Sequence, residues 1–559
     1  MNLLFLQLPR LDHDVTSPGE NNMLAAACLT AALERSEERQ WWTVLPALSE
    51  QETGNDHILI VDIVKAQPDV IAATCYLWNI ERTLHLLACV RKVLPHVRIV
   101  LGGPEIADHH PLLKKSIADA LCIGEGEPLF PEILNQFQVS SFKLQKGRST
   151  PQIYRACESK PIRLVDALPA PNHPINKPDA FGMAYLETNR GCPMKCAFCC
   201  YNLRRSATTC LEPDDVAERI RILRKRGAKE IRLVDPTFNA HPRFDEMLAM
   251  LRRVNRDKKI AFFVEIRADT LTDAQAKLMA QAGITEAEVG VQSTDPKVLR
   301  IIHRPLNEQK VRCGIEALLR QGIKPTVDFM YALPSQDAQD MQRSIDWLAR
   351  FGDAIHPQFL PTLLLPGTEL RDRAKELGLR AQPLPPYRVL ATDTLTSKQL
   401  AEVEQIATEM LGGFDSPTPR FVGKRLSGLF NRPTAQFQVS SFNFHTRESI
   451  GSNRVTLYFD FSYEHVPRII EMVKSSVERE PHILWQFVLN VSEEFPLDIL
   501  DELVAVMRDL PGHWLDRLVS PLGQNKRVAR RLFIKLAPQA TIDASWREAS
   551  EDLLREAFH

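Results

Sequence analysis

The sequence lacks any long apolar run and has almost no excess of charge. No stretch of about 18 apolar residues occurs, so nothing supports a helix that spans a membrane. The 69 lysine and arginine residues balance 70 aspartate and glutamate residues, so no global field concentrates phosphate backbones or anionic lipids. We therefore expect neither nucleic acid nor a membrane as a partner.

Cysteine is scarce as well, with 11 residues in 559, and the number is odd. The opening segment "MNLLFLQLPR" has no positive flank, and Gln7 and Pro9 break its apolar stretch, so it reads as a β-strand and not as a secretory signal. These features predict a reducing, cytoplasmic setting. Clustered thiols in that setting bind metal or carry out redox chemistry more often than they form disulfides.

Proline gathers in two places that suggest domain boundaries. Residues 151–178 hold six prolines, and "RAQPLPPYR" at 380–388 holds three more, which favours extended connectors over helices. At roughly 100 to 200 residues per domain, the length suggests three or four domains. The predicted parts are a sheet domain at 1–142, a linker at 143–182, a barrel at 183–378, and a helical and α+β region at 379–559 that closes over substrate or contacts a partner.

Residues 1–135 alternate short apolar strands with amphipathic helices, among them helices near 80–94 and 108–119. This order predicts an α/β fold, a flavodoxin-like (Rossmann-like) parallel sheet with helices on both faces. Ligands of such folds lie beyond the carboxyl ends of the strands. Three loops follow strand ends there, "ATCYLWN" at 73–79, "LGGPE" at 101–105 and "GEGE" at 124–127, and their glycines allow close backbone approach.

The middle of the chain repeats a strand and a helix six times. This rhythm predicts a partial (β/α)6 barrel of the TIM type, with its chemistry at the carboxyl ends of the strands. The expected strands cover residues 183–188, 230–235, 260–266, 286–291, 324–332 and 357–365.

Directly after the first of these strands, "NRGCPMKCAFCCYN" at 189–202 contains four cysteines. Cys192, Cys196 and Cys199 can hold three corners of a cubane 4Fe-4S cluster, whereas a structural cluster normally takes four cysteines. The open iron can then chelate the amino and carboxylate groups of S-adenosylmethionine (SAM). Structural zinc is the alternative, with Cys200 or Cys210 as the fourth ligand.

The Cys-x-x-x-Cys-x-x-Cys spacing, its place after the first strand, and Phe198 before the third cysteine resemble the radical SAM superfamily. The resemblance implies reductive cleavage of SAM, a small-molecule substrate, and an external electron donor such as flavodoxin or ferredoxin. It also implies SAM contacts near the strand ends. Arg267 shares a strand face with Glu265 and could clamp a carboxylate, while Gln292 replaces the acidic residue of the family's Gly-Ile-Glu-Ser segment. The implied contacts are Phe198, Asp235, Pro236, Thr237, Arg267, Gln292, Ser293 and Leu365.

The order "YLWN", "LGGPE", "GEGE" resembles the cobalamin-binding domain found ahead of many radical SAM enzymes. The motif Asp-x-His-x-x-Gly, which supplies a lower axial histidine, is absent; the corresponding loop reads "PRLDHDVTSPGE", with His13 out of frame. Either cobalamin binds without a protein histidine or the domain has lost it. The implied cobalamin contacts are Thr74, Trp78, Gly102, Gly103, Gly124 and Glu125.

Together these patterns predict a cobalamin-dependent radical SAM methyltransferase that acts on an unactivated centre of a small molecule or natural-product precursor. Two alternatives remain open. One is a radical SAM enzyme without cobalamin that transfers the aminocarboxypropyl arm of SAM or catalyses a rearrangement. The other is a non-catalytic iron–sulfur or zinc protein. The sequence assigns neither the substrate nor a catalytic residue beyond the cluster cysteines.

Overall fold

The computed structural model describes residues 1–9, 23–48, 56–114, 117–139, 151–156, 162–179, 181–201, 208–411, 454–510, 512–519 and 529–558. The chain forms two compact units. The first contains the amino-terminal sheet and the barrel, and the second contains α3 (Asp56–Ala66) and the carboxyl-terminal part. None of the described helices is long and apolar enough to cross a membrane.

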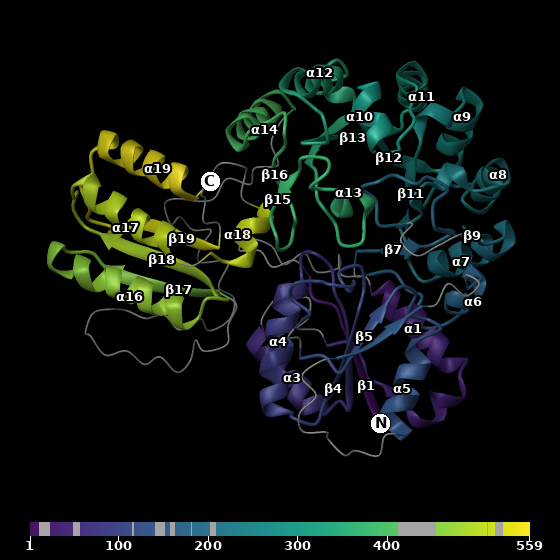
Figure 1. Cartoon of the computed structure of the whole chain (residues 1–559), viewed down its shortest axis with the longest axis horizontal. Coiled ribbons are helices and arrows are strands. Elements are labelled where there is room, and N and C mark those ends of the chain that lie inside the picture. The colour runs from purple at the N-terminus through teal and green to yellow at the C-terminus, as the bar shows by residue number, and fades with distance from the viewer. Residues whose placement is uncertain are drawn as a thin grey trace. The chain divides into compact units, whose positions relative to one another are not determined.

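The amino-terminal sheet has six parallel strands in the order β2-β1-β3-β4-β5-β6 (Figure 1). The order of its first five strands is that of flavodoxin-like folds, as predicted. Helices α1 (Leu24–Glu34) and α5 (Phe130–Val139) lie on one face and α4 (Ile80–Val93) on the other. The strands are β1 (Asn2–Leu6), β2 (Thr43–Val44), β3 (Val70–Thr74), β4 (Arg98–Gly102), β5 (Ala120–Ile123) and β6 (Gln152–Arg155), and η1 (Glu37–Trp41) precedes β2.

Two details of this domain differ from the sequence prediction. The predicted helix near 108–119 is wrong for the described residues there, because 108–114 form turns. Pro111 interrupts the segment, and the buried His110 makes side-chain contacts with Glu105 and Tyr387 that hold it in an irregular path. In addition, β6 pairs with β5 although it falls inside the predicted linker.

The barrel is a sheet of six parallel strands in the order β14-β13-β12-β11-β10-β7, and all six predicted strands are confirmed. Its larger helices lie along the outer side of the sheet (Figure 1). The strands are β7 (Met183–Leu186), β10 (Glu230–Leu233), β11 (Ala261–Ile266), β12 (Ile284–Gln292), β13 (Lys324–Tyr331) and β14 (His356–Pro361). The helices are α7 (Pro213–Lys225), α8 (Phe244–Val254), α9 (Asp273–Ala282), α10 (Pro296–Ile301), α11 (Glu308–Arg320) and α12 (Ala338–Ala349).

Shorter elements connect these parts and close the barrel region. They are α6 (Leu164–Ala167), β8 (Asn189–Arg190), β9 (Thr209–Cys210), η2 (Phe238–Ala240), η3 (Ala268–Thr270), η4 (Gly352–Ala354), α13 (Glu369–Asp372), β15 (Arg380–Ala381), β16 (Val389–Ala391) and α14 (Ser397–Leu411). β15 and β16 form an antiparallel pair that overlaps the second proline-rich stretch, and α14 confirms the predicted helical segment after it.

The barrel strands alternate between a buried outer face and a more polar inner face, as the period of two requires. On β11, Phe262, Val264 and Ile266 pack under the helices, whereas Phe263 and Glu265 point the other way and are half-buried. The apolar core of the barrel therefore lies between strands and helices. The inner face, which we call the lumen, carries the polar side chains.

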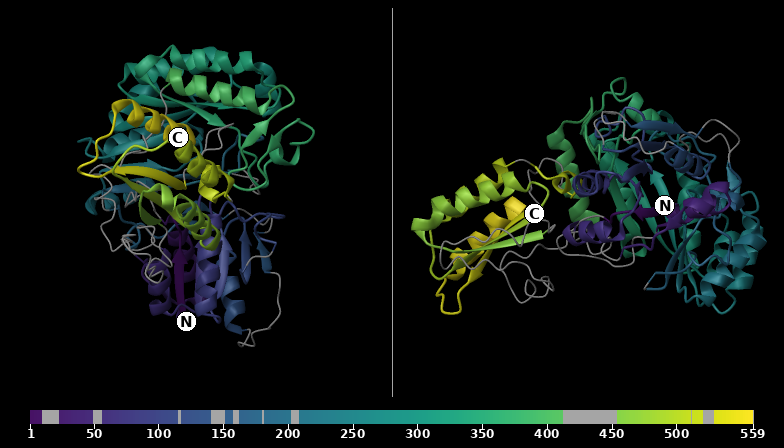
Figure 2. Two further views of the ribbon diagram at one scale, coloured as in Figure 1. Left: turned by 90° about the vertical axis from the view of Figure 1, so that its left-hand side faces the viewer. Right: turned by 90° about the horizontal axis from the view of Figure 1, so that it is seen from below.

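The second unit contains three parallel strands in the order β17-β18-β19, shown side by side in Figure 2. Residues of its three long helices share one apolar cluster with alternate residues of the strands. The predicted small α+β unit is thus a parallel β/α arrangement. Its elements are β17 (Arg454–Asp460), η5 (Tyr463–His465), α16 (Val466–Arg479), β18 (Leu484–Val491), α17 (Leu497–Asp509), α18 (Trp514–Val519), β19 (Arg530–Leu536) and α19 (Ala544–Phe558).

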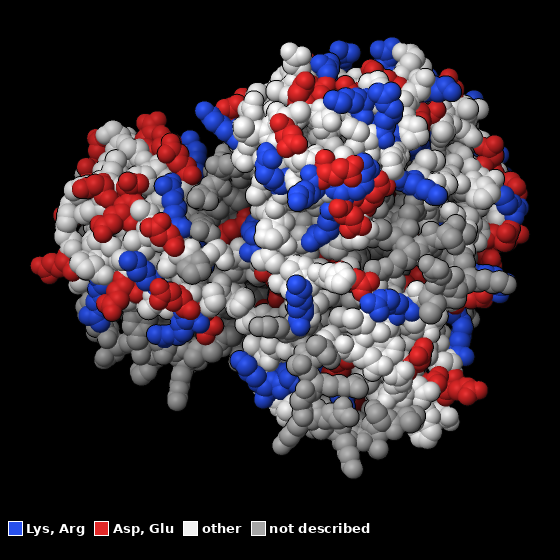
Figure 3. Space-filling view, in the orientation of Figure 1, with Lys and Arg blue, Asp and Glu red and all other residues white. Residues whose placement is uncertain are grey.

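Charged side chains of both signs are interspersed over the face shown in Figure 3. This distribution agrees with the balanced composition of the sequence, and it places no large field of one sign on that face.

Gly314 on α11 provides a test of the barrel packing. A Cβ atom at this position would stand 2.1 Å from the carbonyl oxygen of Ala268, which is too close for any contact. Gly314→Ala should therefore lower the free energy of unfolding by about 2–3 kcal/mol, measured by urea denaturation. The exposed neighbour Cys313→Ala is the matched control and should stay close to wild type. Equal stability of both variants would show that α11 does not pack on η3 this closely.

Candidate active site

The cysteine loop follows β7, and backbone hydrogen bonds connect it to the end of α10 and to α13. The amide of Ala197 donates to the carbonyl of Ile302 at 3.0 Å, and its carbonyl accepts from the amide of Leu370 at 2.8 Å. Within the loop, the Cys199 amide donates to the Cys196 carbonyl at 3.1 Å. These bonds hold the cysteines at the carboxyl ends of the barrel strands, where the sequence placed them.

Asp235, just after β10, holds the start of this loop. Its Oδ1 accepts from the backbone amides of Thr188 at 2.7 Å and Asn189 at 2.9 Å, and its Oδ2 accepts from the Thr188 hydroxyl. The side chain is fully buried. Burial raises the pKa of Asp235 to about 7, against the opposing effect of the three donors. In this structure the carboxylate accepts hydrogen bonds from the protein backbone. The predicted SAM contact of Asp235 stays a prediction.

The thiols of the loop are half-buried and close enough to influence one another. Burial first, and then the neighbouring Cys200, Cys196 and Cys192, raise the pKa of Cys199 to about 12. Negative charges on neighbouring sulfur atoms repel one another, so a cationic group at this loop would be favourable. Soft sulfur donors of this kind suit an iron–sulfur cluster.

Two polar groups lie against these thiols. Arg304 directs Nη1 at Cys196 Sγ across 3.6 Å, and Thr237 Oγ1 lies 3.5 Å from Cys192 Sγ. Among the residues that the structure describes, no three His, Cys, Asp or Glu side chains are arranged to hold a single metal ion.

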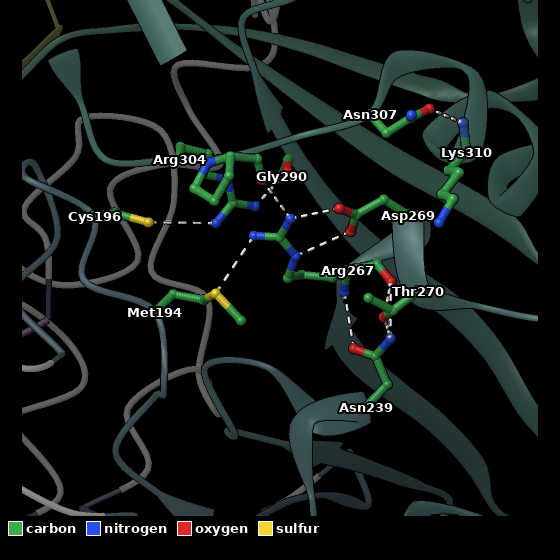
Figure 4. A network of polar contacts seen from close by, with 11 residues as sticks. Met194, Cys196, Asn239, Arg267, Asp269, Thr270, Gly290, Arg304, Asn307 and Lys310 are labelled. Atoms are coloured by element: carbon green, nitrogen blue, oxygen red, sulfur yellow. Dashed lines mark hydrogen bonds and ion pairs between the residues drawn. The ribbon is translucent and has the colours of Figure 1, made fainter. Parts of the chain in front are cut away.

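Arg267 lies next to Arg304 at the carboxyl ends of the barrel strands, which we call the barrel mouth. Figure 4 shows both guanidinium groups beside Met194 and Cys196. Arg267 makes a two-point contact with Asp269, at 3.0 and 2.5 Å, and donates to the Pro305 carbonyl at 2.7 Å. The guanidinium thus holds a carboxylate of the protein itself. Whether it also reaches a SAM carboxylate stays a prediction.

The other predicted SAM contacts come from neighbouring strand ends. Gln292 ends β12 with a positive φ of 70°, and the buried Ser293 accepts from the amide of Asp295 at 3.1 Å. Phe198 packs against the small apolar cluster that includes Ile302 and Leu333. The remaining residues are Pro236 and Thr237 in the turn after β10, and Leu365 in the loop after β14, whose carbonyl accepts from Thr368.

The loops of the sheet domain meet the barrel next to the cysteine loop. Arg190 contacts Glu127 at 2.7 Å and Glu125 at 3.3 Å in the "GEGE" loop, and it also pairs with Glu187 after β7 at 2.8 Å. Glu125 and Glu127 follow β5 and Glu187 follows β7, so this ion-pair group joins the carboxyl edges of the two sheets. Arg190 itself lies two residues before Cys192. Glu125, a predicted cobalamin contact, is one of its members.

A second contact joins the "LGGPE" loop to the segment after the barrel. Tyr387 donates its hydroxyl to Glu105 at 2.6 Å, and His110 Nε2 lies 2.6 Å from the same hydroxyl and 3.0 Å from Glu105. All three side chains are buried. Glu105 also contributes to raising the pKa of Cys200, although burial is the larger cause. The predicted cobalamin edge and the cysteine loop are therefore neighbours.

The predicted cobalamin contacts lie along this edge. Gly103 has a φ of 104°, and a Cβ atom there would stand 2.7 Å from the Cys75 carbonyl oxygen, so only glycine fits. Trp78 is exposed and stacks on Tyr76 at 4.5 Å between ring centroids. Thr74 and Gly102 end the paired strands β3 and β4, and Gly124 follows β5. His13 lies outside the described residues.

Sequence reasoning missed several residues of this site, namely Arg190, Arg304, Glu105, His110, Tyr387, Glu288 and Asp328. Glu288 and Asp328 were detectable, because each is a charged residue on the inner face of a predicted strand. The others contact partners far along the chain, such as Tyr387 with Glu105, and no local pattern signals such a pairing.

The comparisons with known proteins agree with both halves of this site. The family model "Radical SAM superfamily" matches residues 186–348, and the model "B12 binding domain" matches residues 26–134. The uncharacterized methyltransferase PH0819 of Pyrococcus horikoshii is 25% identical over 59% of this chain and 74% of its own length. The cobalamin-dependent radical SAM methyltransferase TokK of Streptomyces tokunonensis is 24% identical over 57% of this chain, and the match spans half of TokK.

Among solved structures, the cobalamin-dependent SAM radical enzyme OxsB with aqua-cobalamin bound superposes with a TM-score of 0.54. The match covers 73% of this chain and 67% of OxsB at 14% identity, so it supports the fold. The chain belongs to the radical SAM superfamily and carries a B12-binding domain ahead of its radical SAM domain. The radical SAM domain implies a 4Fe-4S cluster and SAM as cofactors, and the B12-binding domain implies cobalamin; radical SAM enzymes need a small-molecule substrate and a reductant.

Asp235 allows a test of how the cysteine loop is held. Asp235→Ala removes the acceptor of two buried amides and a hydroxyl, and each unsatisfied group costs about 1–3 kcal/mol. We expect a lower melting temperature and less iron per chain after anaerobic reconstitution. Asp235→Asn is the control, because its Oδ1 can still accept from both amides. Wild-type iron content in Asp235→Ala would contradict the assigned role.

Proposed function

We propose that this protein is a cobalamin-dependent radical SAM methyltransferase that methylates an unactivated centre of a small molecule or natural-product precursor. The observation that carries the proposal is the meeting of two loops. The "GEGE" loop of the B12-binding domain is tied through Arg190 to the strand end that begins the cysteine loop. The names of PH0819 and TokK, both methyltransferases, support the same reaction class.

Cys192, Cys196 and Cys199 are the proposed cluster ligands. Their sulfur-only donor set, half-buried position and mutual repulsion fit a cationic iron–sulfur group. When bound, the cluster supplies the electron that cleaves SAM, and cobalamin supplies the methyl group. Arg304 beside Cys196 stabilises negative charge on that sulfur, and Asp235 keeps the loop backbone in place.

The proposed SAM contacts surround the cysteine loop on neighbouring strand ends. Phe198 offers an aromatic surface, Thr237 a hydroxyl close to Cys192, and Arg267 a guanidinium at the barrel mouth. Gln292 and Ser293 are proposed for the ribose and Leu365 for the adenine, with Asp235 and Pro236 near the methionyl amine. These residues orient the cosubstrate, and orientation supplies a large part of the rate enhancement of such reactions.

The proposed cobalamin contacts are the glycines and the exposed aromatic at the edge of the sheet domain. Gly103 and Gly124 adopt positive φ angles that shape the turns at this edge, and Trp78 stacked on Tyr76 presents an apolar ring surface. No histidine from an Asp-x-His-x-x-Gly motif is part of this proposal, because the sequence has none.

The cellular setting forms part of the proposal. The cysteines that the structure describes are thiols and not disulfides, which favours a reducing cytoplasm with flavodoxin or ferredoxin as the electron donor. The absent histidine motif keeps one second candidate open, a radical SAM reaction that proceeds without cobalamin.

Anaerobic purification with added hydroxocobalamin tests the proposed reaction. We expect a corrin absorption band to co-elute with the protein, and 5'-deoxyadenosine to form from SAM after reduction with dithionite. 5'-Deoxyadenosine without any corrin band would favour the cobalamin-free reaction. An intact cluster with no SAM cleavage would point to a non-catalytic iron–sulfur protein.

Two cysteine variants test the ligand assignment. Cys196→Ala removes a proposed ligand and should abolish SAM cleavage and lower the iron and sulfide content. Cys200→Ala, at the adjacent position, should retain the cluster, because neighbouring residues project in different directions. Iron and sulfide counts on both variants decide the assignment, and equal loss in the two would overturn it.

A further inference from the structure

Three carboxylates face the barrel lumen on adjacent strands. Glu265 on β11 pairs in register with Glu288 on β12, and Asp328 on β13 pairs with Gly290, two residues beyond Glu288. Adjacent strands lie about 4.8 Å apart, so the three side chains are neighbours. We call Glu265, Glu288 and Asp328 the lumenal carboxylates.

Asp328 is buried, Glu265 and Glu288 are half-buried, and the three side chains lie together on the lumenal face. Burial first, and then Glu288, raise the pKa of Asp328. Burial first, and then Glu288 and Asp235, raise the pKa of Glu265 to about 7. Within the described residues none of the three forms an ion pair. Arg304, whose positive charge opposes the rise in the pKa of Asp328, donates to the Gly290 carbonyl and to Cys196.

Asp328 adds a second and separate observation. Its side chain is only 6% exposed, and its Oδ1 has no hydrogen-bond partner in the structure. A buried acceptor without a donor costs about 1–3 kcal/mol, so a ligand N–H group that donates to this atom would be favourable.

Glu265 and Glu288 lie deeper in the barrel than the proposed SAM contacts of their own strands, and Asp328 lies level with Gly290, two residues before Gln292. Glu265 precedes Arg267 by two residues, and Glu288 precedes Gln292 by four, which corresponds to about 7 and 13 Å along the strands. Burial first, and then Glu265 and Glu288, raise the pKa of Tyr201 in the cysteine loop. The lumenal carboxylates therefore face the space below the cysteine loop, where a substrate would extend.

We infer that Glu265, Glu288 and Asp328 bind a cationic group of the substrate, an ammonium or guanidinium, and so hold its reacting end at the barrel mouth. The inference rests on the proposed function. A bare metal ion fits poorly, since no three described acidic side chains are arranged to hold one. An organic cation spans a wider gap, offers several N–H donors, and would offset the buried negative charge.

Binding of small probes to the full-length, anaerobically reconstituted protein in the presence of SAM tests this inference. The probes are n-butylammonium, n-butanol and butyrate, compared by saturation-transfer NMR and titration. We expect n-butylammonium to bind at least about tenfold more tightly than the other two, as a charge-assisted contact allows. Equal binding of the three probes would overturn the inference.

The variant Glu288→Gln/Asp328→Asn should weaken n-butylammonium binding by about tenfold or more. Asp353→Asn, an exposed position on η4, is the control and should bind like wild type. Circular dichroism and iron content establish that each variant is folded and loaded. An unchanged affinity in the double variant would refute the assignment.

A SAM titration separates the two possible sources of the cation, because SAM is itself a sulfonium. Unchanged SAM affinity in the double variant supports a substrate cation, whereas a loss of SAM affinity would assign the carboxylates to the cosubstrate and overturn the inference. Corrin retention and 5'-deoxyadenosine formation are recorded on the wild type in parallel. Their absence defeats the proposed function, while probe binding judges the lumenal carboxylates separately.

Discussion

The ion-pair group of Arg190 is the constraint on which the rest of the site depends. It links Glu125 and Glu127 of one sheet with Glu187 of the other, two residues before Cys192, the first of the proposed cluster cysteines. Because parallel strands present their ligand-binding loops at their carboxyl ends, joining these two edges brings both cofactor regions to one place. Without the guanidinium, three carboxylates in this contact would lose their partner and repel one another.

The two faces of the barrel sheet have different roles, because side chains alternate between them along each strand. The outer face carries the apolar side chains that bury the helices, so the stability of the barrel does not depend on the lumen. The lumen is therefore free to carry Glu265, Glu288 and Asp328, whose burial opposes folding. Acidic side chains whose burial is unfavourable, placed near the cysteine loop, are typical of ligand-binding sites.

Much of the architecture was readable from the sequence because it rests on local periodicity. The six barrel strands and the flavodoxin-like sheet follow from apolar runs separated by amphipathic helices. The helix expected near 108–119 failed because His110 is recruited by Tyr387, 277 residues away. The small carboxyl-terminal unit was expected to be α+β, since periodicity identifies strands but not whether neighbours run parallel.

The sequence by itself indicated the chemistry. Cys192, Cys196 and Cys199 lie within one short loop, so the connectivity of the chain keeps their sulfur atoms close together. The tertiary structure alone decided the surroundings. It turned Asp235 toward the loop backbone, brought Arg304 to Cys196, and gathered three carboxylates from three strands. These contacts depend on strand order and register, which are set by packing across the whole barrel and not by any short stretch of residues.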